Sequence, residues 1–328
     1  WELFKSERDE TFVDEQSRYV DLHRPDGTPD ILQFIEHGVL NLVAQAEQIG
    51  HMASTLSNSV LDNYHHLGDA AAITDGLHYD RNLKPYQKSA DGKSSGTADD
   101  MWAFTTRNPG LDSRAATMFA AASRALTGYN DALAQRALAQ SKRLMAESAE
   151  LLAKAEAEGK NQRRWGADLG TSLQLYAATG EQQYLDKFKD QIWKGLDENV
   201  NRNIQTALDA VPYMDEAYKQ KLRPYVEKYK EYIVGLESEN PYGVPIDLGN
   251  WAGSGSVVGF GTTICFANKY FPDIIPAKYA FRAADYLFGC HPYHNYSLVA
   301  AVGAARPKQV FYGNNRADFS FIPGNVAP

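Results

Sequence analysis

The sequence is poor in cysteine, and it lacks both a long apolar run and a basic stretch. Its 328 residues contain two cysteines, and no apolar segment reaches the roughly 18 residues of a membrane span. The formal net charge is −8, and the densest basic cluster, residues 160–164, is short. We therefore expect no membrane span and no nucleic-acid partner, because phosphate binding needs a basic surface.

The two cysteines are expected on antiparallel helices on either side of Phe271-Pro272. At a rise of about 1.5 Å per residue, the levels of Cys265 and Cys290 along these helices differ by roughly 13 Å. That separation is too large for a disulfide, so we interpret both as free thiols, which leaves the redox compartment undetermined.

The ends of the chain carry no targeting signal. The sequence begins at Trp1, without an initiator Met, signal peptide or lipidation motif, and residues 321–328 are apolar and rich in turn formers. We expect both ends to continue into a longer protein, with any targeting segment outside these residues.

Apolar residues recur at helical spacing through most of the chain, whereas alternating strand patterns are scarce. Asp30, Asp112 and Asp131 are typical of helix starts. Glycines stand where helices should end, at Gly50, Gly128, Gly159, Gly180 and Gly289. The pattern predicts helices over residues 30–49, 112–127, 131–158, 167–179, 181–199, 213–237, 257–270 and 277–288. The best candidate strand is residues 297–302.

A weak repeat occurs three times, around Gly128, around Gly180 and at Phe271-Pro272. Each copy is a helix end, a short turn and a second amphipathic helix, which together predict an αα-hairpin. Repeated hairpins form either an open solenoid or a closed ring. The long irregular insertions at 52–108 and 241–256 favour the ring, with loops gathered at one face around a cleft.

The last forty residues and one earlier loop carry the candidate binding residues. Aromatic rings stack on the apolar face of a sugar, while Asn, Arg and His side chains bond its hydroxyls. Such side chains gather in loops rarely unless they bind a partner. The predicted sugar contacts are Trp251, His294, Tyr312, Asn314, Asn315 and Arg316. The alternatives are a loop that packs on its own body, a Trp251 that anchors its loop, and a surface ion pair between Arg316 and Asp318.

Two further clusters contain polar residues that could belong to a site. His65 and His66 are interpreted as a polar pair rather than a metal site, because adjacent helical residues point about 100° apart. Residues 99–102 and 107–108, within the long insertion, are candidates to line the cleft. We expect no cofactor and no metal site, and the sequence does not decide whether a structural calcium is bound.

Three blocks of this sequence resemble glycoside hydrolase family 9. Thr28-Pro-Asp-Ile-Leu-Gln33 resembles the family's early Pro-Asp-Leu-Leu-Asp-Glu helix, and Ala120-Ala-Ala-Ser-Arg124 resembles its Ala-Ala-Ala-Ser-Arg helix. Gly289-Cys-His-Pro292, followed by Ser297 and Gly303, resembles its Gly-x-Asn-Pro…Ser-Tyr-Val…Gly motif. The last block is the most specific.

The resemblance implies an all-α (α/α)6 toroid with long loops on one face and inverting hydrolysis of β-glycosidic bonds, mostly in β-1,4-glucan. An Asp in an Asp-Ala-Gly-Asp motif acts as base on a water, and a Glu in an Asn-Glu motif protonates the leaving oxygen. Inversion places the two carboxyl groups about 6.5–9.5 Å apart.

This sequence departs from the family in two places. Neither the Asp-Ala-Gly-Asp motif nor an Asn-Glu dipeptide occurs in it, and the predicted helices are fewer than six hairpins require. The family's His-His-Arg sugar-binding signature is replaced by Asn314-Asn315-Arg316, which puts plain cellulose specificity in doubt. We therefore interpret residues 1–328 as one catalytic-type domain, incomplete at both ends and inactive alone.

The expected function is that of a secreted, periplasmic or cell-surface glycoside hydrolase, endoglucanase-like in its intact form. Its partner is an oligo- or polysaccharide, and its oligomeric state is undetermined. The alternatives are a non-catalytic glycan-binding relative and a helical-repeat scaffold for protein partners.

Overall fold

The computed structural model describes residues 7–14, 17, 19–21, 23–54, 56–58, 75–103, 105–159, 167–246, 253–290, 295–299, 302–303 and 326. Contacts divide the chain into two compact units. Unit 1 comprises Trp1–His65 and Ala72–Asp190, and unit 2 comprises His66–Ala71 and Gln191–Pro328. The division falls within helix α5, Gln182–Glu198. The expectation of a single catalytic-type domain stays a prediction.

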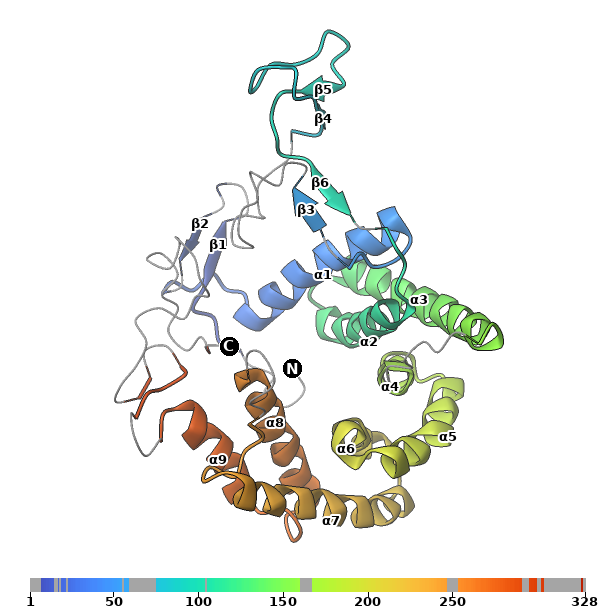
Figure 1. Cartoon of the computed structure of the whole chain (residues 1–328), viewed down its shortest axis with the longest axis vertical. Helices are drawn as coiled ribbons and strands as arrows, with labels where there is room; N and C mark the ends of the chain where they lie inside the picture. The colour runs from blue at the N-terminus through green and yellow to red at the C-terminus, as the bar shows by residue number, and fades with distance from the viewer. Residues whose placement is uncertain are drawn as a thin grey trace. The chain divides into compact units, whose positions relative to one another are not determined.

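Unit 1 is built from three long helices, a shorter fourth helix and several short strands (Figure 1). Its strands pair as β1 with β2, β3 with β6, and β4 with β5. The first two pairs are antiparallel and the third is parallel. The elements are β1 (Phe12–Asp14), β2 (Tyr19–Asp21), α1 (Asp30–Ile49), β3 (Leu56–Asn58), β4 (His78–Tyr79), β5 (Ser94–Ser95), β6 (Met101–Ala103), α2 (Pro109–Leu126), α3 (Asp131–Ala157) and α4 (Ala167–Thr179).

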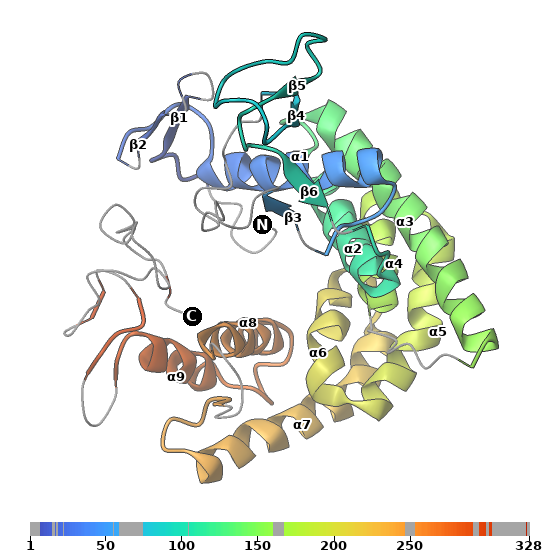
Figure 2. The same cartoon turned by 45° about the horizontal axis from the view of Figure 1, so that its top comes forward.

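Helix α2 lies at the centre of unit 1 and packs against α1, α3 and α4 (Figures 1 and 2). Its many alanines allow this, because small side chains let helices approach closely on several sides. Ala116, Phe119 and Ala120 are fully buried, and α1 and α3 add Val43 and Leu144 to the same core. The Ala-rich helix α3 buries one face and exposes the other.

A charged network joins the end of α1 to α2 and α3. Asp112 has no solvent exposure, and its carboxylate accepts from the Met52 N–H at 2.8 Å and from Arg107 Nε at 2.8 Å. Arg143 of α3 donates to the carbonyls of Ala46 and Gly50 at 3.0 and 2.8 Å. These bonds satisfy carbonyl groups that the end of α1 leaves without helical partners.

Unit 2 contains the remainder of α5, followed by α6 (Val200–Asp209), the 3-10 turn η3 (Val211–Tyr213), α7 (Glu216–Glu239), α8 (Ser254–Tyr270) and α9 (Lys278–Leu287). Helix α6 packs against α7 and α8, and α8 packs against α9. Ile204, Val226 and Ile264 are fully buried in these helices. Asn199 begins α6, because its side chain accepts from the Arg202 N–H at 3.0 Å.

Most helix predictions are confirmed. Helices α1 and α4 have the predicted bounds, and glycines with positive φ stand at Gly50, Gly128, Gly159, Gly180 and Gly289. Helix α2 begins at Pro109, earlier than predicted, because Asn108 rather than Asp112 caps it, with its side chain accepting from the Gly110 N–H at 3.0 Å. Both cysteines are free, as predicted. No described helix is both long and apolar enough to cross a membrane.

One helix was missed, and the strand prediction was wrong. Helix α6 was not predicted, because the preceding helical pattern ran without a break into Asn199. The candidate strand at 297–302 is not a strand in its described residues, where Val299 makes only an isolated bridge with Val326. The Ser297 hydroxyl accepts from the Val299 N–H at 3.0 Å, and this local bond replaces strand pairing.

Candidate functional site

All six residues that the sequence predicts to contact sugar lie outside the described part of the chain: Trp251, His294, Tyr312, Asn314, Asn315 and Arg316. His65 and His66 also lie outside it, so their interpretation as a polar pair stays a prediction. The structure does describe the helix ends from which two of the predicted sugar-binding loops emerge.

These helix ends belong to α7, α8 and α9 of unit 2. The turn at 241–243, which follows α7, leads into the loop that carries Trp251, and this loop joins α8 at its start. The end of α9 leads into the loop that carries His294. A Cβ atom at Gly261 of α8 would lie 3.1 Å from the Ala283 Cβ of α9. Since α8 and α9 form a hairpin, the start of α8 lies near the end of α9.

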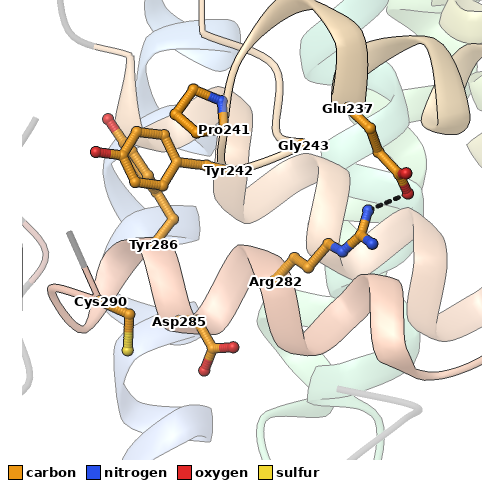
Figure 3. Close-up of a pocket in the computed structure, with 8 residues that line it drawn as sticks. All are labelled: Glu237, Pro241, Tyr242, Gly243, Arg282, Asp285, Tyr286 and Cys290. Atoms are coloured by element: carbon orange, nitrogen blue, oxygen red, sulfur yellow. Dashed lines mark hydrogen bonds and ion pairs between the residues drawn. The ribbon is translucent and has the colours of Figure 1, made fainter. Parts of the chain in front are cut away.

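A cavity of about 350 Å³ lies between the turn after α7 and the last turns of α9 (Figure 3). This volume falls within the range of small-molecule pockets, roughly 300–1,000 Å³. The cavity is lined by Glu237, Pro241, Tyr242, Gly243, Arg282, Asp285, Tyr286 and Cys290. Its walls therefore come from the segments that lead into two of the predicted sugar-binding loops.

An ion pair forms one wall of the cavity. Arg282 Nη1 donates to Glu237 Oε1 and joins α9 to α7 (Figure 3). The side chains of Arg282 and Glu237 are 31% and 41% exposed, so both remain accessible to a ligand. Gly243 has φ +62, and a Cβ atom there would lie 3.0 Å from Arg282 Nη1. Glycine at this position thus leaves room for the guanidinium.

Two tyrosines form the aromatic part of the cavity. The rings of Tyr242 and Tyr286 meet edge to face, with centroids 5.2 Å apart and an interplanar angle of 68°. Figure 3 shows Tyr242, from the turn after α7, lying against Tyr286 of α9. Burial, followed by the neighbouring Tyr242, raises the pKa of Tyr286, so its hydroxyl keeps its proton to a higher pH than an ordinary tyrosine.

The turn that carries Tyr242 is held by one amide side chain. Asn240 Oδ1 accepts from the Tyr242 N–H at 3.1 Å, and its Nδ2 donates to the Val244 carbonyl at 2.9 Å. The Gly243 N–H also donates to the Asn240 carbonyl at 3.2 Å. These bonds fix the backbone of the turn that carries Tyr242.

The motif loop after α9 is fastened to the helix end. The N–H groups of Gly289 and Leu298 donate to the carbonyls of Tyr286 and Leu287, at 3.2 and 2.8 Å. Gly289 has φ +89, and a Cβ atom there would lie 2.6 Å from the Ser297 nitrogen, so only glycine fits. The Gly and Ser of the resemblance motif therefore hold the loop against α9.

Gly303 has the same kind of role. Its φ is +94, and a Cβ atom there would lie 2.7 Å from the Phe288 carbonyl oxygen and 2.8 Å from the Ser297 Cβ. Ser297 itself is fully buried. The motif residues that the structure describes thus shape the loop, and the contacts of the loop with a ligand would come from its other side chains.

The side chains that line the cavity suit the binding of a polar ring. None of the contacts described around it identifies a lining residue as a general acid or base. Arg282 supplies donors, Glu237 and Asp285 supply acceptors, and the tyrosines supply apolar faces and hydroxyls. Within the described residues, no group of three or more His, Cys, Asp or Glu side chains could hold a metal ion. Polar groups beside aromatic rings are what a carbohydrate site requires.

A sequence model of glycosyl hydrolase family 9 matches residues 57–317. The chain belongs to this family. The match spans most of the chain, including the cavity and all six predicted sugar contacts. No curated protein sequence is similar enough to match.

Solved structures of family 9 proteins share the fold. A metagenome-derived family 9 endoglucanase is 21% identical, with a TM-score of 0.60 over 92% of this chain and 53% of that one. A family 9 protein of Bacteroides ovatus is 15% identical, with a TM-score of 0.58 over 92% and 55%. The endoglucanase of the termite Nasutitermes takasagoensis is 15% identical, with a TM-score of 0.54 over 83% and 60%.

The fold class predicted from the sequence is confirmed. The chain has the all-α, (α/α)6-type fold of family 9, and it spans between about half and three fifths of the length of these structures. At these identities the similarity establishes the fold alone.

The candidate cleft residues of the long insertion bond within unit 1. Asp99 accepts from the Asp75 N–H at 2.7 Å, and Asp100 accepts from the Tyr79 N–H at 2.9 Å. Arg107 bonds Asp112, and Asn108 caps α2. These contacts give Asp99, Asp100, Arg107 and Asn108 structural roles. The other two candidates, Met101 and Trp102, lie in strand β6, which pairs with β3.

The cavity residues were not identified from the sequence. Tyr242 and Tyr286 belong to different elements, and neither lies in a recognisable motif. The available signal was the Pro-Tyr-Gly turn at 241–243, which places an aromatic residue directly after a helix end in an insertion expected to reach the cleft.

Proposed function

We propose that this chain is part of a glycoside hydrolase that cleaves β-glycosidic bonds in cellulose-type β-glucans, with inversion. The family 9 match over residues 57–317 carries this proposal. Structures of the same fold include two described as endoglucanases, and another, of AaCel9A, holds a cellobiose-like isofagomine. A polysaccharide substrate also accords with a secreted or cell-surface location, which we include in the proposal.

In this proposal the sugar lies across the loops that emerge beside the cavity. The Trp251 ring stacks on a pyranose, and His294, Tyr312, Asn314, Asn315 and Arg316 bond its hydroxyls. The described cavity supports this arrangement, because Tyr242 and Arg282 lie on the segments that lead into two of these loops. A sugar there would meet aromatic faces and charged donors together.

We place the catalytic Asp and Glu outside these 328 residues. The reason is that neither an Asp-Ala-Gly-Asp motif nor an Asn-Glu dipeptide occurs in the sequence. The base that activates water and the acid that protonates the leaving oxygen would both be absent. These residues alone should therefore bind β-glucan oligosaccharides without cleaving them.

Calorimetric titration with cellohexaose, together with a reducing-sugar assay on β-glucan, tests the proposal. Trp251→Ala should weaken binding by about 1–3 kcal/mol, the usual range for loss of a large aromatic contact. Trp251→Phe is the matched control, because it keeps an aromatic face and should retain most of the affinity. Circular dichroism of each variant checks that it is folded.

The outcomes separate the parts of the proposal. Binding without turnover supports it, whereas turnover by these residues would show that the catalytic pair is misplaced. A folded chain that binds no β-glucan oligosaccharide would contradict the substrate class. If the longer protein binds but never cleaves, the chain belongs instead to a non-catalytic glycan-binding relative.

A further inference from the structure

Tyr86 is the most exposed large aromatic or apolar side chain among the described residues, with 84% of its surface open to solvent. It lies in unit 1, in the loop between β4 and β5 (Figure 1). Its neighbours Lys84, Gln87 and Lys88 are also exposed. The ring therefore stands among polar side chains and contributes little to the core.

The backbone of Tyr86 is unusual for such a residue. Its φ is +64, in the left-handed region that favours glycine. The residue lies in a turn closed by the Gln87 N–H, which donates to the Lys84 carbonyl at 2.9 Å, with Pro85 at the second position. A turn with proline second and a positive φ third ordinarily has glycine or asparagine at that third position. A tyrosine there costs backbone energy that its exposed ring does not offset by packing.

The loop holds this conformation firmly. A Cβ atom at Gly96 would lie 2.0 Å from the Lys84 carbonyl oxygen, so glycine permits β5 to approach the turn. The Gly96 N–H donates to the Gln87 carbonyl at 2.9 Å, and the Tyr86 N–H donates to Thr97 Oγ1 at 3.3 Å. The ring is therefore presented from a fixed backbone, and binding would order few additional groups.

We propose that Tyr86 is an additional contact for polysaccharide, separate from the cavity beside α9. The flat phenol ring suits the apolar face of a pyranose in a β-glucan, and the flanking Lys84 ammonium can bond its hydroxyls, whereas the Gln87 amide oxygen already accepts from the Lys84 N–H at 3.1 Å. This inference rests on the proposed function, because the ligand class comes from there. Strained backbone that lacks a packing reason is typical of functional positions.

The test compares Tyr86→Gly with Tyr86→Phe in the full chain. Tyr86→Gly removes the ring and suits the positive φ, whereas Tyr86→Phe keeps the ring. Binding to insoluble cellulose is measured by depletion, binding to cellohexaose by calorimetry, and the melting temperature by circular dichroism. We expect Tyr86→Gly to bind cellulose about tenfold more weakly, as for an interfacial contact of a little over 1 kcal/mol, and to melt at a higher temperature. Tyr86→Phe should bind like the parent.

Each outcome bears on the inference. Unchanged cellulose binding by Tyr86→Gly, while Trp251→Ala loses cellohexaose binding, would overturn the role of Tyr86 and leave the proposed function standing. A lower melting temperature for Tyr86→Gly would overturn the argument from backbone strain, because the ring would then serve stability. If the parent chain binds neither ligand, the proposed function fails and the inference fails with it.

Discussion

Two arginine–carboxylate pairs, one in each unit, have the same chemistry and different surroundings. In unit 1, Arg107, which is itself 29% exposed, bonds an Asp112 carboxylate that has no solvent exposure. In unit 2, Arg282 bonds Glu237 while both side chains stay about a third or more exposed. A carboxylate without solvent exposure depends on its partners, because removing them leaves an uncompensated buried charge. An exposed pair contributes little to stability and is free to meet a ligand.

The comparison predicts its largest effect at Asp112. Asp112→Ala should lower the free energy of unfolding by about 1–3 kcal/mol, because the buried Met52 N–H loses its acceptor, while Arg107 keeps its ion pair with Glu147. Urea unfolding of the full chain measures this change. Asp112→Asn is the control, since its amide oxygen can still accept from Met52, and it should lose less. A loss below about 1 kcal/mol for Asp112→Ala would remove the distinction between the two pairs.

A smaller stability effect is expected at Arg282. Arg282→Ala should change the free energy of unfolding by about 1 kcal/mol or less, because the pair with Glu237 is screened by water. The same variant should weaken cellohexaose binding if the cavity contacts the sugar. Glu237→Gln leaves Arg282 in place and removes the charge of its partner. It therefore tests whether cellohexaose binding depends on the guanidinium itself or on the ion pair. A large loss of stability with unchanged affinity would show that this pair, too, serves the fold.

The smallest expected effect is on the stability of the chain at acidic pH. Burial alone would raise the pKa of Glu147, but hydrogen bonds from Arg107 and Arg143 outweigh it, so the pKa lies below its ordinary value. Glu147 therefore contributes stability above the usual glutamate pKa of about 4.3, and this contribution is lost as the pH falls through the lowered value. Between pH 6 and about pH 3, the free energy of unfolding should decrease less for Glu147→Gln than for the parent chain. If the free energies of unfolding of the two proteins change equally with pH, the lowered pKa of Glu147 is contradicted.

Local sequence signals predicted the helices well where the helix end is chemically marked. Gly50 ends α1 and Gly180 follows α4, both with positive φ, and the bounds of both helices were predicted correctly. The start of α2 was misplaced because Asp112 has the residue type of a cap, whereas its carboxylate turns inward to Arg107 and Met52. The direction of a side chain depends on tertiary contacts that no local window contains.

The candidate site was less predictable, for a similar reason. The loop residues around Trp251 and His294 could be singled out by their chemistry, and they remain predictions. The Tyr242–Tyr286 contact and the Glu237–Arg282 pair join residues distant in sequence, and they exist only because α7 and α9 meet. The positive φ of Tyr86 had no sequence signal beyond the preceding proline.

The closure of the motif loop on α9 bears on how members of this family are recognised. Gly289, Ser297 and Gly303 touch one another or the helix end, and their side-chain sizes are dictated by that fit. A protein that had abandoned hydrolysis would still need them in order to fold. Their presence indicates common ancestry and a shared fold. Whether a protein is an active hydrolase depends on other residues.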